Sequence, residues 1–178
     1  MATKLQAVDA EARFRAVFAH LGEVTAYARR RGSADADAIA AETMTIAWRR
    51  LQDVPRDDPR PWLFATARHL LLAEWRRRPH WSGAAPDDDQ MTSSFHVAPE
   101  ARMLDAELMA ALSSLSPGQL EALLLVAWED LSPSLGAKAV GISQAAFRVR
   151  LHRARRELRR ALATRRTATT QRATVQRS

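Results

Sequence analysis

The sequence predicts an all-α protein of two small helical domains joined by a flexible linker, with a helix-turn-helix in the second domain. Apolar residues recur every three or four positions through most of the 178-residue chain, the period of a helix with one buried face. Residues that favour helix ends separate these stretches. No segment shows the alternation of apolar and polar residues that is typical of a strand. The predicted units are a first domain at 9–79, a linker at 80–104, a second domain at 105–163 and a basic disordered tail at 164–178.

The first domain is predicted to contain three helices. One covers residues 9–31, and a second begins after Ser33, whose hydroxyl can cap the first free amides. A polar loop with two prolines follows at 52–60, and Pro61 can open a third helix that runs to Arg78. Three amphipathic helices with short links can enclose one small core.

The third of these helices is predicted to have one buried face and one free face. The buried face carries Leu63, Ala67, Leu70 and Leu71. The opposite face carries Ala65, Arg68, His69, Leu72 and Arg76. We therefore expect its cationic side chains to be available to a ligand.

Signals for helices return after the linker. Ser116-Pro117 and Ser132-Pro133 each combine an N-cap hydroxyl with proline at the first helical position, where its missing N–H costs nothing. Gly141 can take a positive φ and end the short helix that precedes it. Gly136 lies inside that helix, and a mid-helix glycine is expected to cost about 1 kcal/mol relative to alanine.

Ser143 can cap a further helix with strongly divided faces. Its apolar stripe is Phe147, Leu151, Ala154 and Leu158. The opposite face carries Ala145, Arg148, Val149, His152, Arg153 and Arg156. One interpretation is a solvated basic helix. The order of helix, glycine turn and capped second helix favours a helix-turn-helix whose second helix enters the major groove of DNA.

The charge distribution indicates a polyanionic partner for the carboxyl-terminal end. The formal net charge is +7, yet residues 144–163 carry seven arginines against one acid, and residues 164–178 add four more arginines. We expect binding to such a partner to weaken steeply with salt.

Several function classes are disfavoured by what the chain lacks. It has no cysteine, which excludes disulfides and thiolate metal sites and fits a reducing cytoplasm. No glycine-rich phosphate loop and no His-Glu-x-x-His pattern occurs, so we expect no catalytic residues, no cofactor and no metal. No apolar run approaches the length of a membrane span, so membrane insertion is not expected.

Four segments resemble bacterial RNA polymerase sigma factors of the sigma-70 superfamily, extracytoplasmic-function (ECF) type. Residues 35–51 resemble the helix that binds core polymerase, and residues 59–70 resemble the segment that melts and reads the −10 promoter element. Residues 115–119 and 141–155 resemble the domain that reads the −35 element. The resemblance covers roughly residues 10–163. It implies a cytoplasmic, non-enzymatic factor that confers promoter recognition on core polymerase.

The resemblance implies a role for particular residues. Asp35, Asp37, Glu42 and Trp48 would face the clamp helices of the β′ subunit, and the second domain would meet the β flap. Trp62, Arg68, His69 and Arg76 would hold the opened −10 strand. Arg148, Val149, His152 and Arg153 would contact −35 bases, with Arg150 and Arg155 on phosphates. The alternative interpretation is that Trp48 and Trp62 are both core residues. An anti-sigma protein is a further partner that the resemblance allows.

Two other functions remain open at this point. The chain could be a stand-alone helix-turn-helix regulator that binds duplex DNA as a dimer without polymerase. It could also be a degenerate sigma-like protein that only binds a partner. The acidic run at 87–89 is a candidate Mg²⁺ cluster, an RNA mimic or simply a solvated stretch of the linker.

Overall fold

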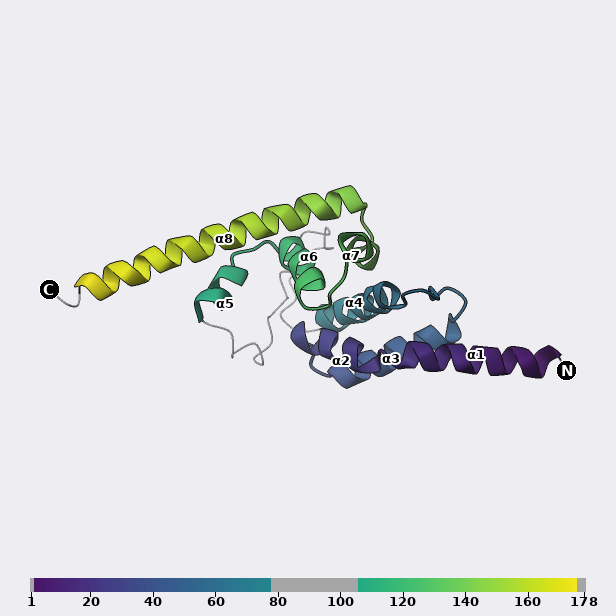
Figure 1. Cartoon of the computed structure of the whole chain (residues 1–178). Coiled ribbons are helices and arrows are strands. Elements are labelled where there is room, and N and C mark those ends of the chain that lie inside the picture. The colour runs from purple at the N-terminus through teal and green to yellow at the C-terminus, as the bar shows by residue number, and fades with distance from the viewer. Residues whose placement is uncertain (1, 78–105, 176–178) are drawn as a thin grey trace.

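The computed structural model describes residues 2–77 and 106–175, and every regular element in these residues is an α-helix (Figure 1). The first domain contains α1 (Ala2–Phe18), α2 (Leu21–Arg30), α3 (Ala36–Arg49) and α4 (Arg60–Arg76). The second contains α5 (Ala106–Leu112), α6 (Pro117–Ala127), α7 (Pro133–Val140) and α8 (Gln144–Val175). The all-α prediction is confirmed. The predicted linker at 80–104, including the acidic run at 87–89, lies entirely outside the described residues.

The first helical stretch is divided, which corrects the prediction of one helix over 9–31. α1 ends at Phe18, and α2 begins at Leu21 after a turn at Ala19 and His20. The His20 ring nitrogen Nδ1 lies 2.8 Å from Glu23 Oε1, three residues into the new helix. His20 makes no side-chain hydrogen bond to the backbone of α2, so the sequence offers no capping signal for this start.

The cap of α3 also differs from the prediction. The N-cap is Asp35, whose side chain accepts a hydrogen bond from the Ala38 amide at 2.9 Å. The Ser33 hydroxyl instead donates to Glu74 Oε2 on α4 at 2.7 Å. A carboxylate at this position also complements the positive end of the helix dipole, whereas Ser33 ties the preceding turn to α4.

The caps predicted in the second domain are confirmed. Ser132 accepts from the Leu135 amide at 3.3 Å, and Ser143 accepts from the Ala146 amide at 3.2 Å. Gly141 has φ 73° and ends α7 in the left-handed conformation. At the start of α6, the Ser116 amide donates to Gln119 Oε1 at 2.9 Å. These local bonds set where the helices of the second domain begin and end.

The first domain encloses a core between α2, α3 and α4. Tyr27 of α2 stacks on Phe64 of α4, with ring centroids 4.8 Å apart. Ala40 and Ala47 of α3 are fully buried beside them, which lets this helix approach closely. The predicted inward face of α4 is confirmed, with Leu63, Ala67 and Leu71 buried and Leu70 half-buried.

In the second domain, α6 and α7 both pack against the amino-terminal part of α8, and α5 packs farther along it. Phe147, Leu151 and Ala154 are buried in the body of the domain, as the sequence predicts. Leu158 closes a smaller apolar cluster with leucines 112, 115, 120 and 124. The carboxyl-terminal part of α8 extends away from the other helices (Figure 1).

The two domains are in contact, which nothing in the sequence predicts. α7 packs against α4, so α4 lies between α2 and α3 on one side and α7 on the other (Figure 1). One apolar cluster crosses from the first domain into the second and includes Leu71, Leu131 and Val140. The predicted free face of α4 is consequently buried at Arg68 and Leu72.

The predicted disordered tail is wrong for most of its length. α8 continues through residues 164–175 and ends at Val175. The tail contains neither glycine nor proline, and alanine, arginine and glutamine are compatible with a helix, so nothing after Gly141 stops it.

Candidate promoter and polymerase interfaces

The outer face of α8 presents the residues predicted to read the −35 element. Arg148, His152 and Arg153 are exposed, and Val149 is 50% exposed. Phe147 and Leu151, on the opposite side of the helix, are buried. One rigid helix therefore presents several cations and one apolar side chain together, a combination that suits base edges and thymine methyl groups in a major groove.

The two arginines predicted to bind phosphates occupy different environments. Arg155 is exposed. Arg150 is half-buried, and its guanidinium lies over Gly118, where an added Cβ would be 3.0 Å from Nη1. Arg150 therefore rests on the start of α6, at the edge of the cationic face.

Gly136 determines how α8 sits on α7. A Cβ at this position would lie 2.5 Å from Cζ of Phe147, the fully buried aromatic residue at the start of α8. The absence of a side chain lets the Phe147 ring pack directly on the backbone of α7. The helix-propensity cost expected from the sequence is thus offset by a close contact between the two helices of the helix-turn-helix.

The four residues predicted to hold the −10 strand are not all on one free face. His69 and Arg76 of α4 are exposed, and Trp62 is half-buried against the core. Arg68 is only 8% exposed, which corrects its assignment to the free face. The physical reason is the packing of the second domain on α4, which the helical period of α4 cannot reveal.

A buried ionic cluster links the domains, and we call its residues Tyr27, Arg30, Arg31, Glu121 and Glu129 the clasp. Arg31 Nε donates to Glu121 Oε2 at 3.0 Å, and Arg31 Nη1 donates to Glu129 Oε1 at 3.0 Å. The Tyr27 hydroxyl donates to Glu121 Oε1 at 3.0 Å, and Arg30 donates to Glu129. α2 and its C-cap residue Arg31 thus supply the donors, and α6 with the turn after it supplies the carboxylates.

The surroundings of the clasp shift the pKa of two groups. Burial raises the pKa of Tyr27 well above its ordinary value, and the Glu121 carboxylate raises it further, against the lowering effect of Arg31 and Arg68. Burial opposes the charge of Arg31, but the carboxylates of Glu121 and Glu129 more than compensate and raise its pKa. Arg31 therefore stays charged in the interior, and Tyr27 stays neutral.

The surface predicted to bind polymerase lies on α3. Asp35, Asp37 and Glu42 are exposed, and Asp35 also serves as the helix cap. Trp48 is 50% exposed, so it is not a core residue.

Two aromatic residues of α1, Phe14 and Phe18, extend this surface. Phe14 contacts Trp48 edge-on at 5.0 Å between ring centroids, and Phe18 lies 5.9 Å from Phe14. Phe18 is 47% exposed. The spacing of four between Phe14 and Phe18 places them on one face of α1, but only the packing against α3 shows that this face is partly open.

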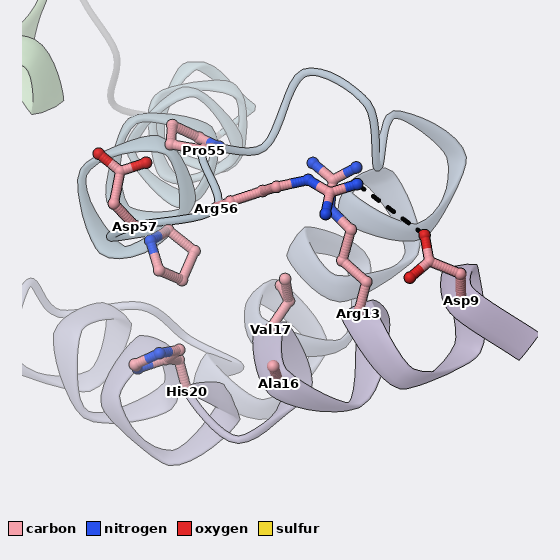
Figure 2. A pocket seen from close by; sticks show the side chains of 9 residues that line it. Asp9, Arg13, Ala16, Val17, His20, Pro55, Arg56 and Asp57 are labelled. Atoms are coloured by element: carbon pink, nitrogen blue, oxygen red, sulfur yellow. Dashed lines mark ion pairs between the residues drawn. The ribbon is translucent and has the colours of Figure 1, made fainter.

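A pocket of about 410 Å³ opens between α1 and the loop that precedes α4 (Figure 2). Arg13 joins its two walls, because Nη2 donates to the Val54 carbonyl at 2.7 Å and Nη1 donates to Gln52 Oε1 at 3.2 Å. Arg56 of the loop reaches Asp9 of α1 at 3.9 Å. The sequence predicts the loop but does not identify α1 as its partner.

In residues 2–77 and 106–175, no three His, Asp or Glu side chains are grouped so that they could hold a metal ion. Among the same residues, none of the helices has the length and apolar content needed to cross a bilayer.

The folded chain is thus a two-domain helical protein with a helix-turn-helix and several cationic and aromatic surfaces. The sequence matches the family described as "Sigma-70 region 2" over residues 17–80 and the one described as "Sigma-70, region 4" over residues 105–158. RNA polymerase sigma factor NccH of Alcaligenes xylosoxydans xylosoxydans is 32% identical over 133 residues, which are 70% of this chain and 71% of that protein.

Two solved structures are similar. CnrH, in complex with the cytosolic domain of CnrY, has a TM-score of 0.61 at 26% identity, over 92% of this chain and 99% of that one. The sigma factor RpoE from Bartonella quintana, in complex with the anti-sigma factor NepR, has a TM-score of 0.57 at 20% identity, over 84% and 95% of the two chains. The second likeness concerns the fold alone.

The chain belongs to the sigma-70 family of RNA polymerase sigma factors and is of the extracytoplasmic-function type. It is a factor that directs transcription initiation.

Proposed function

We propose that this sigma factor divides promoter recognition between residues 9–79, which bind core polymerase and open the −10 element, and residues 105–163, which read the −35 element. The observation that carries the proposal is the exposed cationic face of α8, held by a capped turn and a buried apolar stripe. Such a helix can present side chains to a major groove while the rest of the domain contacts the backbone.

On the −35 element, Arg148, Val149, His152 and Arg153 contact base edges. An arginine can grip guanine O6 and N7 with two hydrogen bonds, which carries sequence information. Arg150 and Arg155, at the borders of this face, bind phosphates and fix the register.

On the −10 element, His69, Arg76 and Trp62 contact the opened strand along α4. The pocket beside the loop is within the size range of small-ligand sites, and its arginines 13 and 56 suit an unstacked base next to its phosphate. We assign the pocket and the loop at 52–60 to contact with the opened −10 strand. Arg68 belongs to this surface only when the second domain moves off α4.

Core polymerase binds the acidic and aromatic surface of α3 and α1. Asp37 and Glu42 favour a basic partner, and Phe14, Phe18 and Trp48 supply apolar area that is only partly covered by this chain. The β′ clamp helices are the partner for this surface, and the β flap is the partner for the second domain.

The protein acts in the cytoplasm with no catalytic residues of its own and takes an anti-sigma protein as a regulatory partner. The likeness to CnrH, whose solved structure contains the cytosolic domain of CnrY, supports a protein partner of this kind.

Run-off transcription from a promoter library, with core polymerase in the presence and absence of this protein, tests the proposal. We expect new start sites that depend on the protein, and loss of them when Glu42 and Trp48 are both replaced by alanine. Asp53→Asn, which removes an exposed ion pair with Arg50 outside the proposed polymerase-contacting residues, is the control. Tight binding of the isolated protein to duplex promoter DNA as a dimer, without new start sites, would instead favour a stand-alone regulator. Binding to polymerase without initiation would favour a degenerate sigma-like protein.

A further inference from the structure

α8 continues well beyond the domain to which it belongs. The helix has 32 residues and ends at Val175, whereas the family match of the second domain ends at residue 158. In the described part of the chain, Leu158 is also the last residue of α8 that takes part in an apolar cluster. Residues 159–175, which we call the α8 extension, therefore add about 25 Å of helix outside the body of the domain (Figure 1).

The α8 extension is strongly cationic. Arg159 and Arg160 are exposed, and from residue 159 to the end of the chain the sequence holds six arginines and no acid. An isolated helix of this length is marginally stable in water, and like charges along it repel one another. Because it has few apolar residues to bury, such a helix gains stability from a polyanion rather than from packing on another protein surface.

One side of the extension is continuous with the face proposed to read the −35 element. At about 100° per residue, Arg155 and Arg159 lie within about 20° of the direction of Arg148 around the helix axis. His152 lies within about 40° of the same direction. All four side chains are exposed. α8 thus presents one row of cationic and imidazole side chains that begins at the proposed base contacts and continues past the end of the domain.

The dimensions of the major groove decide what the far end of this row can reach. In a helix-turn-helix, the amino-terminal residues of the second helix contact the base edges. Arg148 lies near the start of α8, and Arg159 follows eleven residues later, about 16 Å along the axis. This length exceeds the depth of the groove, about 8.5 Å, and its width, about 12 Å, and a straight helix cannot follow the groove around the DNA. When Arg148 contacts bases, Arg159 is therefore outside the groove, at the level of the phosphate backbone.

We propose that the α8 extension is a second DNA-binding element, which lies against the phosphate backbone immediately outside the −35 element and makes its first contact through Arg159. The inference rests on the proposed function, because it requires α8 to be seated in the major groove of the −35 element. The ligand of the extension is flanking duplex DNA of any sequence. The extension adds affinity and fixes the direction of α8 on the DNA, whereas the selection of bases stays with the amino-terminal part of the helix.

The salt dependence of promoter binding tests this inference. Arg159→Gln removes one exposed charge and keeps a residue that favours a helix. With core polymerase and promoter duplex, we expect the slope of log K against log salt concentration to fall in magnitude by about 0.9, the loss of one phosphate contact. Raising the salt from about 50 to about 200 mM should then cost the variant about 3.5-fold less affinity than the parent. Hydroxyl-radical footprinting should show protection of the backbone next to the −35 element by the parent and its loss in the variant.

Arg160→Gln is the matched control. Arg160 is the next residue of the extension, lies about 100° around the helix from Arg159 and pairs with Glu157 at 3.3 Å. This substitution removes the same formal charge from the same helix but leaves the row intact, so the salt slope and the footprint should equal those of the parent. A chain that ends at Ala163 removes most of the extension and should reduce the slope further than Arg159→Gln does.

Unchanged salt slopes for both Arg159→Gln and the shortened chain would overturn the inference. Equal reductions from Arg159→Gln and Arg160→Gln would also overturn it, because they would indicate a long-range effect of charge rather than a contact. Weaker binding of either variant to core polymerase without DNA would place the extension on polymerase instead. Failure of the parent to initiate with core polymerase would refute the proposed function. A parent that initiates and loses −35 selectivity on Arg148→Ala, but shows no role for Arg159, would refute this inference alone.

Discussion

The two helices proposed to contact DNA, α4 and α8, differ in how many of their faces are covered. α8 buries one stripe and leaves the opposite face open, as its helical period predicts. α4 buries a stripe of that kind and also part of its opposite face, at Arg68 and Leu72, because α7 lies on its outer side. The helical period of the sequence indicates which residues are compatible with a core. The number of helices that pack against the element decides which of its faces stays exposed.

The two faces proposed to contact DNA are therefore not equally exposed in the free protein. The −35 face is exposed in the structure, and part of the −10 face is covered by the second domain. Variants that weaken the packing of the second domain on α4 should expose Arg68 and Leu72. Variants on the cationic face of α8 should change DNA binding without changing how the domains pack.

The largest effect is expected from Arg31→Leu. The substitution leaves the carboxylates of Glu121 and Glu129 buried without their shared cation, and breaking a buried pair in this way costs about 3–5 kcal/mol. Urea denaturation should show this loss as a lower free energy of unfolding. Arg15→Leu, which removes one exposed pair, should change the free energy of unfolding by about 0.5 kcal/mol or less. Equal losses from the two variants would mean that the clasp does not stabilise the folded protein.

Gly136→Ala is expected to loosen the contact between α7 and α8. The added Cβ would lie 2.5 Å from Cζ of buried Phe147, and overpacking of this kind costs about 1–3 kcal/mol, more than the roughly 1 kcal/mol that alanine contributes to a helix. The matched control is Gly22→Ala in α2, where an added Cβ meets nothing within 4 Å. Thermal unfolding should show a lower midpoint for the first variant and an equal or higher one for the second.

Arg148→Ala tests whether the open face of α8 reads sequence. We expect promoter binding by the complex with core polymerase to weaken by about 1–3 kcal/mol and selectivity to relax at one −35 position. Arg155→Ala should weaken binding to all sequences alike and reduce its salt dependence. The readout is competition binding across −35 variants. A uniform loss for Arg148→Ala would place this residue on a phosphate.

The smallest effect at neutral pH concerns Tyr27, the one tyrosine in the chain. Burial raises the pKa of its phenol in the folded protein, so the folded state holds this proton more tightly than the unfolded state. The stability contributed by neutral Tyr27 is therefore fully present below its unfolded pKa of about 10 and falls as the pH rises toward the higher folded value. Tyrosinate absorbance should appear at higher pH in the folded than in the urea-unfolded protein. Coincident titrations would show that the hydroxyl is not buried in solution.

The sequence by itself determined the helical class, the caps at Ser132, Gly141 and Ser143, and the division of α8 into a buried and a cationic face. These features depend on residues within a few positions of one another, because capping bonds and helical faces are local. Local signals for helix ends are weak at 9–31 and at 164–178. The structure therefore differs there from the predicted single helix and the predicted disordered tail.

Only the tertiary structure decided which domain surfaces meet. The bond between Tyr27 and Glu121 spans 94 positions, and the close approach of Gly136 to Phe147 depends on the angle at which two helices pack. Neither contact has a signature in composition or period, because each side chain looks locally like an ordinary surface or helix residue. The outer face of α4 and the clasp lose contact with water only when the second domain packs on the first. That packing depends on the complementary shape and charge of two surfaces that exist only after each domain has folded.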